Sequence, residues 1–393
     1  MSKAFDRVHH SFIFPALLRA GVNMSLIVSL QKLYTDMQAS VFLWEGAESR
    51  AFAIERGVRQ GDPLSTLLFN LVLDEVLQEV GQIWQRRGYG SNVGQTFSGE
   101  RLTHVAFADD MTLLARSWTM IRRMVSHVRA ALAKRGLSLH PDKCKLQTNR
   151  PGWQRRGAQN VDEGFDVTVL PEGAPIKVLG TMVDLFDVTG TEVRNRISAG
   201  WRMFWSMSRQ LQNKKVSLKK RLQLFDATVS SCVLWCAQSW TPRVEELNRL
   251  TSTRHAMLRR MVGTGRGPDE EWLPWFRRAT HAAVRAASLH KVRDWVSAHG
   301  RCKWLWAGHV ARRPASTWVW RVTTWRDYSW QQVVNDSSCR PLRPSRRRWM
   351  KWEDSLRRFA QHMGIGSWNV VCGDRERWTE LTANFVQWSA ERE

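Results

Sequence analysis

The sequence predicts an α+β domain at the amino-terminal end, followed by an α-helical region. Three observations support this fold class. Strand-like and helix-like apolar patterns alternate up to about residue 185, and only helical patterns follow. The last part of the chain is rich in arginine and tryptophan, with 18 of the 22 tryptophans after residue 200. Because mixed elements followed by a run of helices are typical of separate domains, we expect three regions: 1–185, 186–265 and 266–393.

The charge of the chain favours a polyanionic partner. Lysine and arginine outnumber aspartate and glutamate by 59 to 36, which gives a net charge of +23. Nucleic acid is therefore the first expected partner, and an acidic membrane surface the second. No apolar run approaches the roughly 20 residues that a membrane span requires, and the first residues lack the apolar stretch of a signal peptide. We expect an intracellular protein of the nucleus or cytoplasm with no membrane partner; its oligomeric state stays open.

The first third of the chain predicts helices and one hairpin. Residues 7–35 read as helical, with a break near the middle. Residues 40–44 and 50–54 alternate in strand fashion around a Glu-Gly pair and predict a hairpin. The stretch from Pro63 to about Gln85 predicts a long helix, because proline suits a helix start and the apolar residues that follow recur at helical spacing.

The following elements are shorter. Apolar strands are expected at 103–108 and 111–115, and a basic amphipathic helix at 121–134. The stretch 137–148 predicts a further strand or a loop. The Gly- and Pro-rich residues 151–175 are a candidate boundary. A short strand is expected at 176–183, and three helical patterns extend from there to about residue 262.

Two adjacent carboxylates stand between the strands at 103–108 and 111–115. Asp109 and Asp110 at a tight turn would project near one strand edge, and Mg²⁺ prefers a few carboxylate oxygens together with substrate phosphates. Taken alone, an Asp-Asp pair is ordinary turn chemistry. The pair becomes more informative because a second motif precedes it by about 40 residues.

The second motif is Arg56-Gly-Val-Arg-Gln-Gly-Asp-Pro-Leu-Ser-Thr-Leu-Leu-Phe-Asn70. A loop that caps a helix would explain Gly61, Asp62 and the proline after them. It does not explain the additional glycine, the glutamine and the two arginines. A glycine-rich turn that leads into a helix is suited to lying against a nucleotide.

Together the two motifs resemble the palm of a reverse transcriptase of the non-LTR (LINE-type) retrotransposon class. The resemblance extends over nearly the whole chain and implies a right-hand polymerase fold. In that fold, 1–185 would be a palm, with an antiparallel sheet and helices, and 186–265 a helical thumb. It implies an RNA-directed DNA polymerase that transfers nucleotides with two Mg²⁺ ions, or Mn²⁺ in their place. Its partners would be an RNA template, a DNA primer and deoxynucleoside triphosphates.

The resemblance also implies roles for individual residues. Lys3-Ala4-Phe5-Asp6 matches the second half of the family's first motif, and Gly136-Leu137-Ser138 through Lys143 resembles its fourth. The tail patterns around Trp306, Arg346 and Asp374 occur in the family's order. The implied sites are Asp109 and Asp110 for catalysis and metal binding, Lys143 for catalysis, Phe5, Gln60 and Gly61 for the nucleotide, and Leu179 and Gly180 for the primer grip.

Two departures from the family pattern bear on activity. The catalytic aspartate of the first motif would stand immediately before Met1, and the fingers that normally precede it are missing. Loss of one of three metal-binding carboxylates predicts a rate lower by about three or more orders of magnitude. We therefore expect an N-terminally truncated reverse transcriptase with little or no activity. Whether the truncation is real or the start is miscalled is open at this point.

Basic residues of the later regions are candidates for nucleic-acid binding. A helical thumb that follows a duplex needs cations for the phosphates. The cluster near residue 346 adds tryptophans such as Trp349 and Trp352 that could stack on bases. An ordinary solvated basic face and buried tryptophans are the alternative for both. The candidates are Lys214, Lys215, Lys219, Lys220, Arg346, Arg347 and Arg348.

Other interpretations stay open from the sequence. A degenerate palm and thumb that only bind RNA or an RNA–DNA hybrid would also explain the motifs and the charge. A group II intron maturase has a similar palm, but its tail is expected to differ from the Trp/Arg motifs of this chain. A zinc site is disfavoured, since the six cysteines form no CxxC pair and His299, Cys302 and His309 lack a fourth ligand at suitable spacing.

Overall fold

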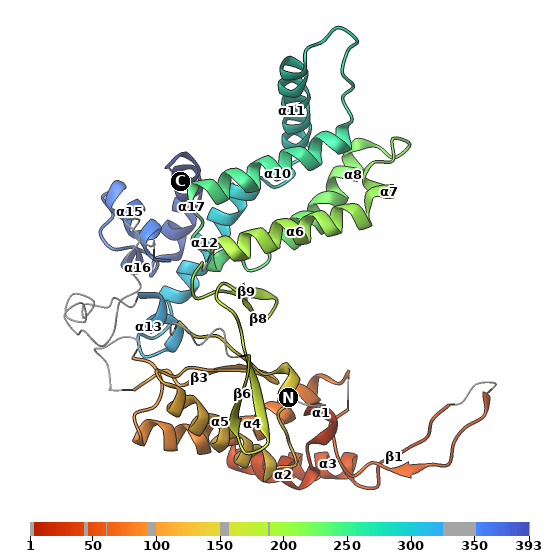
Figure 1. Cartoon of the computed structure of the whole chain (residues 1–393), viewed down its shortest axis with the longest axis vertical. Coiled ribbons are helices and arrows are strands. Elements are labelled where there is room, and N and C mark those ends of the chain that lie inside the picture. The colour runs from red at the N-terminus through yellow and green to blue at the C-terminus, as the bar shows by residue number, and fades with distance from the viewer. Residues whose placement is uncertain are drawn as a thin grey trace. The chain divides into compact units, whose positions relative to one another are not determined.

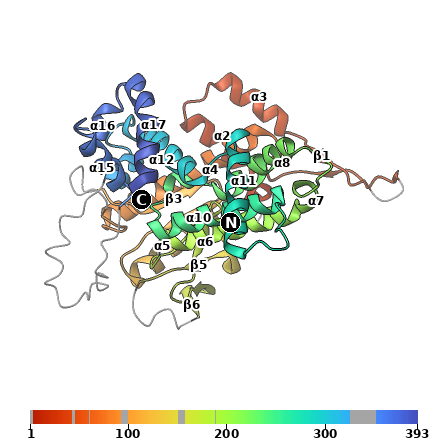
Figure 2. The ribbon, with the colours of Figure 1, turned by 90° about the horizontal axis from the view of Figure 1, so that it is seen from above.

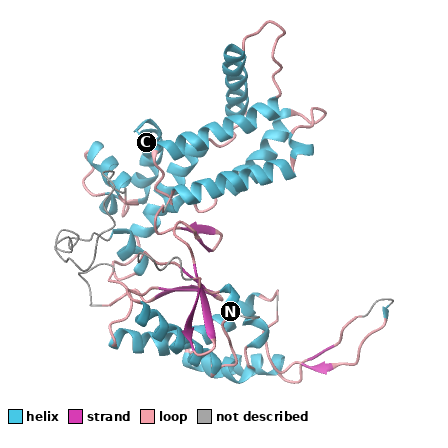
Figure 3. Ribbon diagram, viewed as in Figure 1, coloured by secondary structure: helices cyan, strands magenta, loops and turns pink. Residues whose placement is uncertain are grey.

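The structure is a computed structural model that describes residues 4–42, 46–59, 61–92, 100–149, 157–187, 189–324 and 351–392 (Figure 1). The chain divides into two compact units, Met1–Glu172 and Gly173–Glu393. Helices and small sheets alternate in unit 1, and helices dominate unit 2 (Figure 3). The predicted mixed helix and strand class is confirmed. The predicted division into three regions stays a prediction.

Unit 1 contains both candidate motifs. Its helices and strands have the following bounds: α1 Ala4–Arg7, α2 His10–Arg19, α3 Met24–Tyr34, β1 Gln38–Ala39, β2 Phe52–Ala53, α4 Pro63–Arg86, β3 His104–Phe107, β4 Asp110–Leu113, α5 Trp118–Ala133, η2 Pro141–Lys143, β5 Lys145–Leu146, β6 Ala158–Asp162 and β7 Phe165–Val169.

Helix α4 forms the centre of unit 1. The Asp62 side chain accepts a hydrogen bond from the Leu64 backbone N–H at 2.9 Å, and Pro63 occupies the first turn, where it needs no hydrogen-bond partner. Residues of α4 such as Phe69 and Val76 are fully buried and pack in one core with α2, α3 and α5. The predicted helix from Pro63 to about Gln85 is confirmed. Its start could be predicted because the capping residue and the proline are adjacent in the sequence.

Within the described residues, the strands form four small sheets. The pairs are β1–β2, β3–β4, and β8 (Ile176–Val178) with β9 (Thr181–Val183), and the three-stranded sheet has the order β5-β7-β6. The resemblance implied an antiparallel sheet, and all pairs are antiparallel except β5–β7, which is parallel. Strands β6 and β7 lie where only a Gly/Pro-rich boundary was expected. Apolar and polar residues alternate in Phe165-Asp-Val-Thr-Val169, which follows a Glu-Gly turn. This pattern could have predicted the two strands.

The predicted single strand at 176–183 is wrong. The structure forms a hairpin there, with β8 Ile176–Val178 and β9 Thr181–Val183 paired in antiparallel register. The two residues between the strands have positive φ, +48° at Leu179 and +82° at Gly180. A two-residue turn with both φ positive matches the twist of a hairpin. Leucine rarely adopts this conformation. The apolar residues of 176–183 therefore predicted one continuous strand instead of a turn.

Unit 2 begins with this hairpin and continues as helices. Its remaining elements are α6 Gly190–Ser206, α7 Ser208–Leu211, α8 Leu218–Phe225, the π-helical turn η4 Asp226–Ser230, α9 Ser231–Val233, η5 Ala237–Ser239, α10 Val244–Val262, α11 Trp272–Leu289, α12 Trp295–Ala311, α13 Trp318–Thr324, α15 Asp354–His362, α16 Trp368–Val371 and α17 Arg375–Arg392.

The described residues of unit 2 form two hydrophobic cores. Helices α6 and α10 lie side by side (Figures 1 and 2) and share the first core with α8, part of α11 and the start of α12. The predicted boundary at 265/266 falls inside this core, since Leu258 precedes it and Trp295 follows it. The second core joins α12, α15, α16 and α17. At its centre the Trp304 and Trp378 rings stack with centroids 3.7 Å apart.

Several tryptophans of the described residues serve packing. Trp84, Trp240, Trp295, Trp304, Trp368, Trp378 and Trp388 are buried, whereas Trp205, Trp235 and Trp272 are each more than half exposed. Within the ranges that the structure describes, no helix combines the length and apolar character needed to cross a membrane.

Candidate nucleotide and nucleic-acid site

The two candidate metal-binding carboxylates lie at the tip of a hairpin. Strands β3 and β4 pair in a register that sets Phe107 opposite Asp110, which leaves Ala108 and Asp109 as a two-residue turn. Ala108 has φ +48°, the left-handed conformation that the first position of such a turn requires. Asp109 is half-buried, and Asp110 begins β4 and is exposed.

One face of the hairpin is exposed to solvent and carries both apolar and acidic side chains. Val105 and Phe107 are 55% and 66% exposed, and Asp110 shares their face because it pairs with Phe107. On the opposite face, Met111 and Leu113 pack against the core of unit 1. The hairpin thus has a fixed underside and carries its carboxylates at an accessible end. This geometry suits the binding of a cation or of a group that carries one.

The glycine-rich turn before α4 is bonded to the start of the chain. The backbone N–H of Gly57 donates to the Val8 carbonyl, and that of Val58 to the Phe5 carbonyl, both at 2.8 Å. The His10 ring lies 2.8 Å from the Gly57 carbonyl oxygen. The half-buried Phe5 ring stacks on Phe69 of α4 with centroids 4.8 Å apart. The structure therefore brings the candidate residue Phe5 and this turn together.

No contact with Phe5 is described for the other predicted nucleotide-binding residues, Gln60 and Gly61, or for the predicted catalytic residue Lys143. Gly61 is exposed, with φ +91°, at the end of the turn. Gln60 lies outside the described residues. Lys143 is exposed at the end of η2, the short helix before β5. These placements leave the assigned roles of the three residues as predictions.

Gly57 is predicted to be the more sensitive of the two glycines. Both have φ above +90°, but a Cβ on Gly57 would lie 3.0 Å from Asp6 backbone atoms, whereas one on Gly61 would meet nothing within 4 Å. We expect Gly61→Ala to cost about 1 kcal/mol of unfolding free energy through backbone strain. Gly57→Ala adds a backbone clash, so about 2–3 kcal/mol is expected. Urea unfolding of both variants tests this ranking, and equal losses would contradict it.

The predicted primer-grip residues form an anchored turn in unit 2. The Trp235 indole N–H donates to the Leu179 carbonyl at 3.4 Å, and the Arg196 guanidinium donates to the Gly180 carbonyl. Arg196 is paired through Nε with Glu192 Oε1 at 2.5 Å, and Glu192 accepts the Met182 backbone N–H at 2.7 Å. The Leu179 side chain is 45% exposed. The turn is thus held from behind and presents an apolar side chain to solvent.

The Glu192–Arg196 pair was missed by sequence reasoning. Both residues are buried, with relative exposures of 1% and 7%. Their i, i+4 spacing on a helix is visible in the sequence. That spacing is shared by many exposed pairs, so it did not distinguish this buried one.

The predicted nucleic-acid-binding lysines are all exposed. Lys214 and Lys215 lie in the loop between α7 and α8, and Lys219 and Lys220 lie on α8. The predicted Arg346, Arg347 and Arg348 lie outside the described residues. Among the residues that are described, no group of three or more histidines, cysteines or acidic residues could hold a metal ion.

His299, one of the residues considered for a zinc site, is buried in the described structure. His299 is 2% exposed and its ring stacks on Trp240 with centroids 5.9 Å apart. Burial, together with the charge of the neighbouring Lys303, lowers the pKa of His299 to about 3. The imidazole is therefore neutral at pH 7 and packs as part of the core.

Comparisons with known proteins agree with the two motifs. Residues 1–183 match the family model described as reverse transcriptase (RNA-dependent DNA polymerase). A transposon-derived protein of Caenorhabditis elegans is 27% identical over 289 residues, which cover 72% of this chain and 95% of that protein. The Pol polyprotein from the type-1 retrotransposable element R2 of Popillia japonica is 36% identical over 141 residues, which cover 36% of this chain and 19% of the polyprotein.

A third relative is similar over about as much of the chain as the Popillia japonica polyprotein. The Pol polyprotein from a type-2 retrotransposable element of Drosophila melanogaster is 33% identical over 144 residues, which cover 37% of this chain and 13% of the polyprotein. The matched segments make up less than a quarter of each of these Pol polyproteins.

Proposed function

Residues 1–183 of this chain belong to the reverse transcriptase family in its non-LTR retrotransposon class, and we propose that the chain binds an RNA template paired with a DNA primer. The observation that carries the proposal is the turn of the β3–β4 hairpin, where Asp109 and Asp110 stand together inside the matched segment. The net charge of +23 supports a polyanionic partner.

Divalent metal fits the carboxylate turn in its donor chemistry. Mg²⁺ takes one or two carboxylates together with water and substrate phosphates, and Asp109 and Asp110 offer such oxygens at an accessible turn. The metal would supply charge neutralisation at the phosphates. The protein's own contribution is to hold the two carboxylates on a hairpin whose other face is packed on the core.

The remaining assignments follow the same proposal. Residues 1–185 act as a palm, with Phe5, Gln60 and Gly61 against the nucleotide and Lys143 near the leaving group. The Leu179–Gly180 turn contacts the primer strand, and 186–265 form a thumb with Lys214, Lys215, Lys219 and Lys220 toward the duplex. Arg346, Arg347 and Arg348 add cations for the strand. The bonds between Phe5 and the turn at Gly57 support the nucleotide part.

A non-catalytic binding protein is the second candidate function. It is favoured by one observation: within the described residues, no third metal-ligating side chain joins Asp109 and Asp110 in a group that could hold a metal. Under this alternative, the chain binds RNA or an RNA–DNA hybrid without extending the primer. Both candidate functions include binding of the hybrid, and they differ in whether the primer is extended. We expect little or no nucleotide incorporation by this chain.

Hybrid binding in Mg²⁺ and in EDTA tests the proposed role of the carboxylates. We expect Mg²⁺ to tighten binding of the wild-type chain about fivefold, roughly 1 kcal/mol, because Asp109 and Asp110 would hold the metal and the metal would neutralise charge on a phosphate. The double variant Asp109→Asn/Asp110→Asn should lose this Mg²⁺ effect. In EDTA it should bind at least as tightly as wild type, because two negative charges near the phosphates are gone. Gel shift or fluorescence anisotropy measures both affinities.

A matched control separates the carboxylate turn from charge in general. Asp269→Asn changes an exposed aspartate of unit 2 and should keep the Mg²⁺ effect. Failure of the wild-type chain to bind hybrid in either condition would refute the proposed function. Binding with an unchanged Mg²⁺ effect in the double variant would refute the metal assignment alone.

A further inference from the structure

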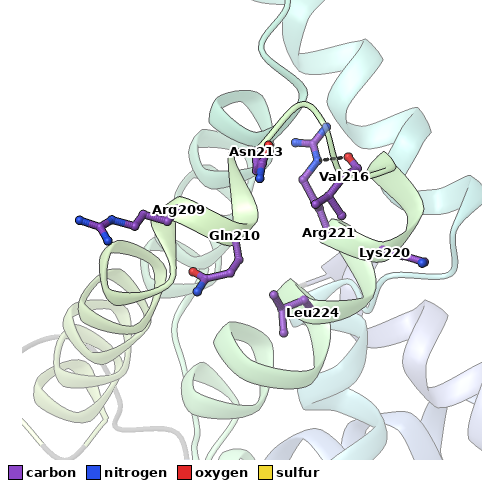
Figure 4. A pocket seen from close by; sticks show the side chains of 7 residues that line it. All are labelled: Arg209, Gln210, Asn213, Val216, Lys220, Arg221 and Leu224. Atoms are coloured by element: carbon purple, nitrogen blue, oxygen red, sulfur yellow. Dashed lines mark hydrogen bonds between the residues drawn. The ribbon is translucent and has the colours of Figure 1, made fainter.

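A cavity with a mixed lining of apolar, amide and cationic side chains lies between α7 and α8 of unit 2. Its volume is about 460 Å³. Figure 4 shows side chains from both helices and from the loop between them around this space. The lining residues are Arg209, Gln210, Asn213, Val216, Lys220, Arg221 and Leu224. A volume of this size is in the range of small-molecule sites, roughly 300–1,000 Å³, and exceeds what one phosphate group fills.

The cavity is positively charged without a compensating carboxylate. Three of its lining side chains are cationic and none is acidic. From residue 193 to residue 225 the sequence contains no aspartate or glutamate. Arg209 and Lys220 are exposed, and neither forms an ion pair within the described residues. Such a lining attracts an anion.

Arg221 gives this charge a fixed, buried member. Its side chain is 6% exposed, and Nη1 donates to the carbonyls of Leu211 at 3.1 Å and Met261 at 2.6 Å. Nε donates to the Val216 carbonyl at 3.1 Å (Figure 4). In the described part of the chain these acceptors are backbone carbonyls with partial charges only. A buried cation without a carboxylate is costly, and a bound anion would offset that cost.

The rest of the lining suits a nucleobase. The wall formed by Val216 and Leu224 is apolar and can contact the face of a ring. The amides of Gln210 and Asn213 offer donors and acceptors for a base edge. Asn213 Oδ1 already accepts the Lys215 backbone N–H at 3.0 Å, which fixes the orientation of that amide.

We propose that this cavity binds one nucleotide of a nucleic-acid strand, with its phosphate attracted by the cationic lining and its base against Leu224 beside Gln210. The inference rests on the proposed function, because it deepens nucleic-acid binding to a defined contact. A strand is the expected source of the nucleotide. A free nucleotide shares the same phosphate and base chemistry, and the experiment below distinguishes the two.

The test compares matched variants of exposed residues by fluorescence anisotropy with a labelled single-stranded oligonucleotide. Gln210→Ala removes one amide without a change in charge and should weaken binding about fivefold. Gln212→Ala, an exposed neighbour that does not line the cavity, should bind as wild type does. Arg209→Ala should weaken binding about tenfold and Arg202→Ala only about twofold, since Arg202 contributes through general charge.

Competition and photocrosslinking locate the contact. An oligonucleotide carrying 4-thiouridine should crosslink to residues between 208 and 224. A nucleoside 5′-monophosphate should compete far less well than an unlabelled strand, and inorganic phosphate less still. Full competition by the monophosphate would overturn the strand assignment. Equal binding by the Gln210→Ala and Gln212→Ala variants would overturn the cavity assignment, whereas absence of wild-type binding would overturn the proposed function itself.

Discussion

Primer extension by this chain on an RNA template is expected to be about three or more orders of magnitude slower than extension by an active non-LTR reverse transcriptase assayed in parallel. The family resemblance implies three carboxylates around the metal ions, and it identifies two of them in this chain, Asp109 and Asp110, at the turn of the β3–β4 hairpin. Metal clamping stabilises the transition state by several kcal/mol. Since each ~1.4 kcal/mol is a factor of ten in rate, loss of one carboxylate from such a site would be sufficient for this decrease.

The assay needs a DNA primer on an RNA template, deoxynucleoside triphosphates and Mg²⁺, with Mn²⁺ as a second condition. The same preparation is tested for hybrid binding, so that a misfolded sample is recognised. We expect incorporation at the level of the Asp109→Ala variant. Incorporation well above that level, and lost in Asp109→Ala, would show that two carboxylates are sufficient and would sink this prediction.

Local signals account for the parts of unit 1 that the sequence predicted correctly. Helix α4 begins where Asp62 and Pro63 provide a cap and a first turn, and these act within three residues. The β3–β4 hairpin follows from two apolar strands with polar residues between them. The pair of motifs could therefore be placed on the right elements before any tertiary contact was known.

Tertiary contacts account for what the sequence did not predict. Leu179 adopts φ +48° because side chains from α6 and from the segment before η5 bind the carbonyls of its turn. Trp352 was a candidate for stacking on bases, but its indole N–H donates to the Gln238 carbonyl at 2.7 Å, and its ring packs against the second core of unit 2. Both outcomes depend on residues distant in the sequence, which no local pattern reveals.

Glu192→Ala is expected to lower the unfolding free energy of unit 2 by about 3–5 kcal/mol, because it leaves a buried guanidinium without its carboxylate. Arg196 is 7% exposed, and its bond to Glu192 measures 2.5 Å. The substitution also removes the acceptor of the Met182 backbone N–H, which lies in β9 of the hairpin. Arg194→Ala on the same helix breaks an exposed pair with Asp187 and should cost about 1 kcal/mol or less.

The double variant Glu192→Ala/Arg196→Met distinguishes an unpaired charge from a general packing defect. If the buried charge dominates the loss in Glu192→Ala, removal of both charges should restore part of the stability in urea unfolding. The hairpin should not recover with it, because methionine cannot donate to the Gly180 carbonyl. We therefore expect faster amide exchange in β8 and β9 in both variants. A double variant less stable than Glu192→Ala would instead assign the loss to packing around Arg196.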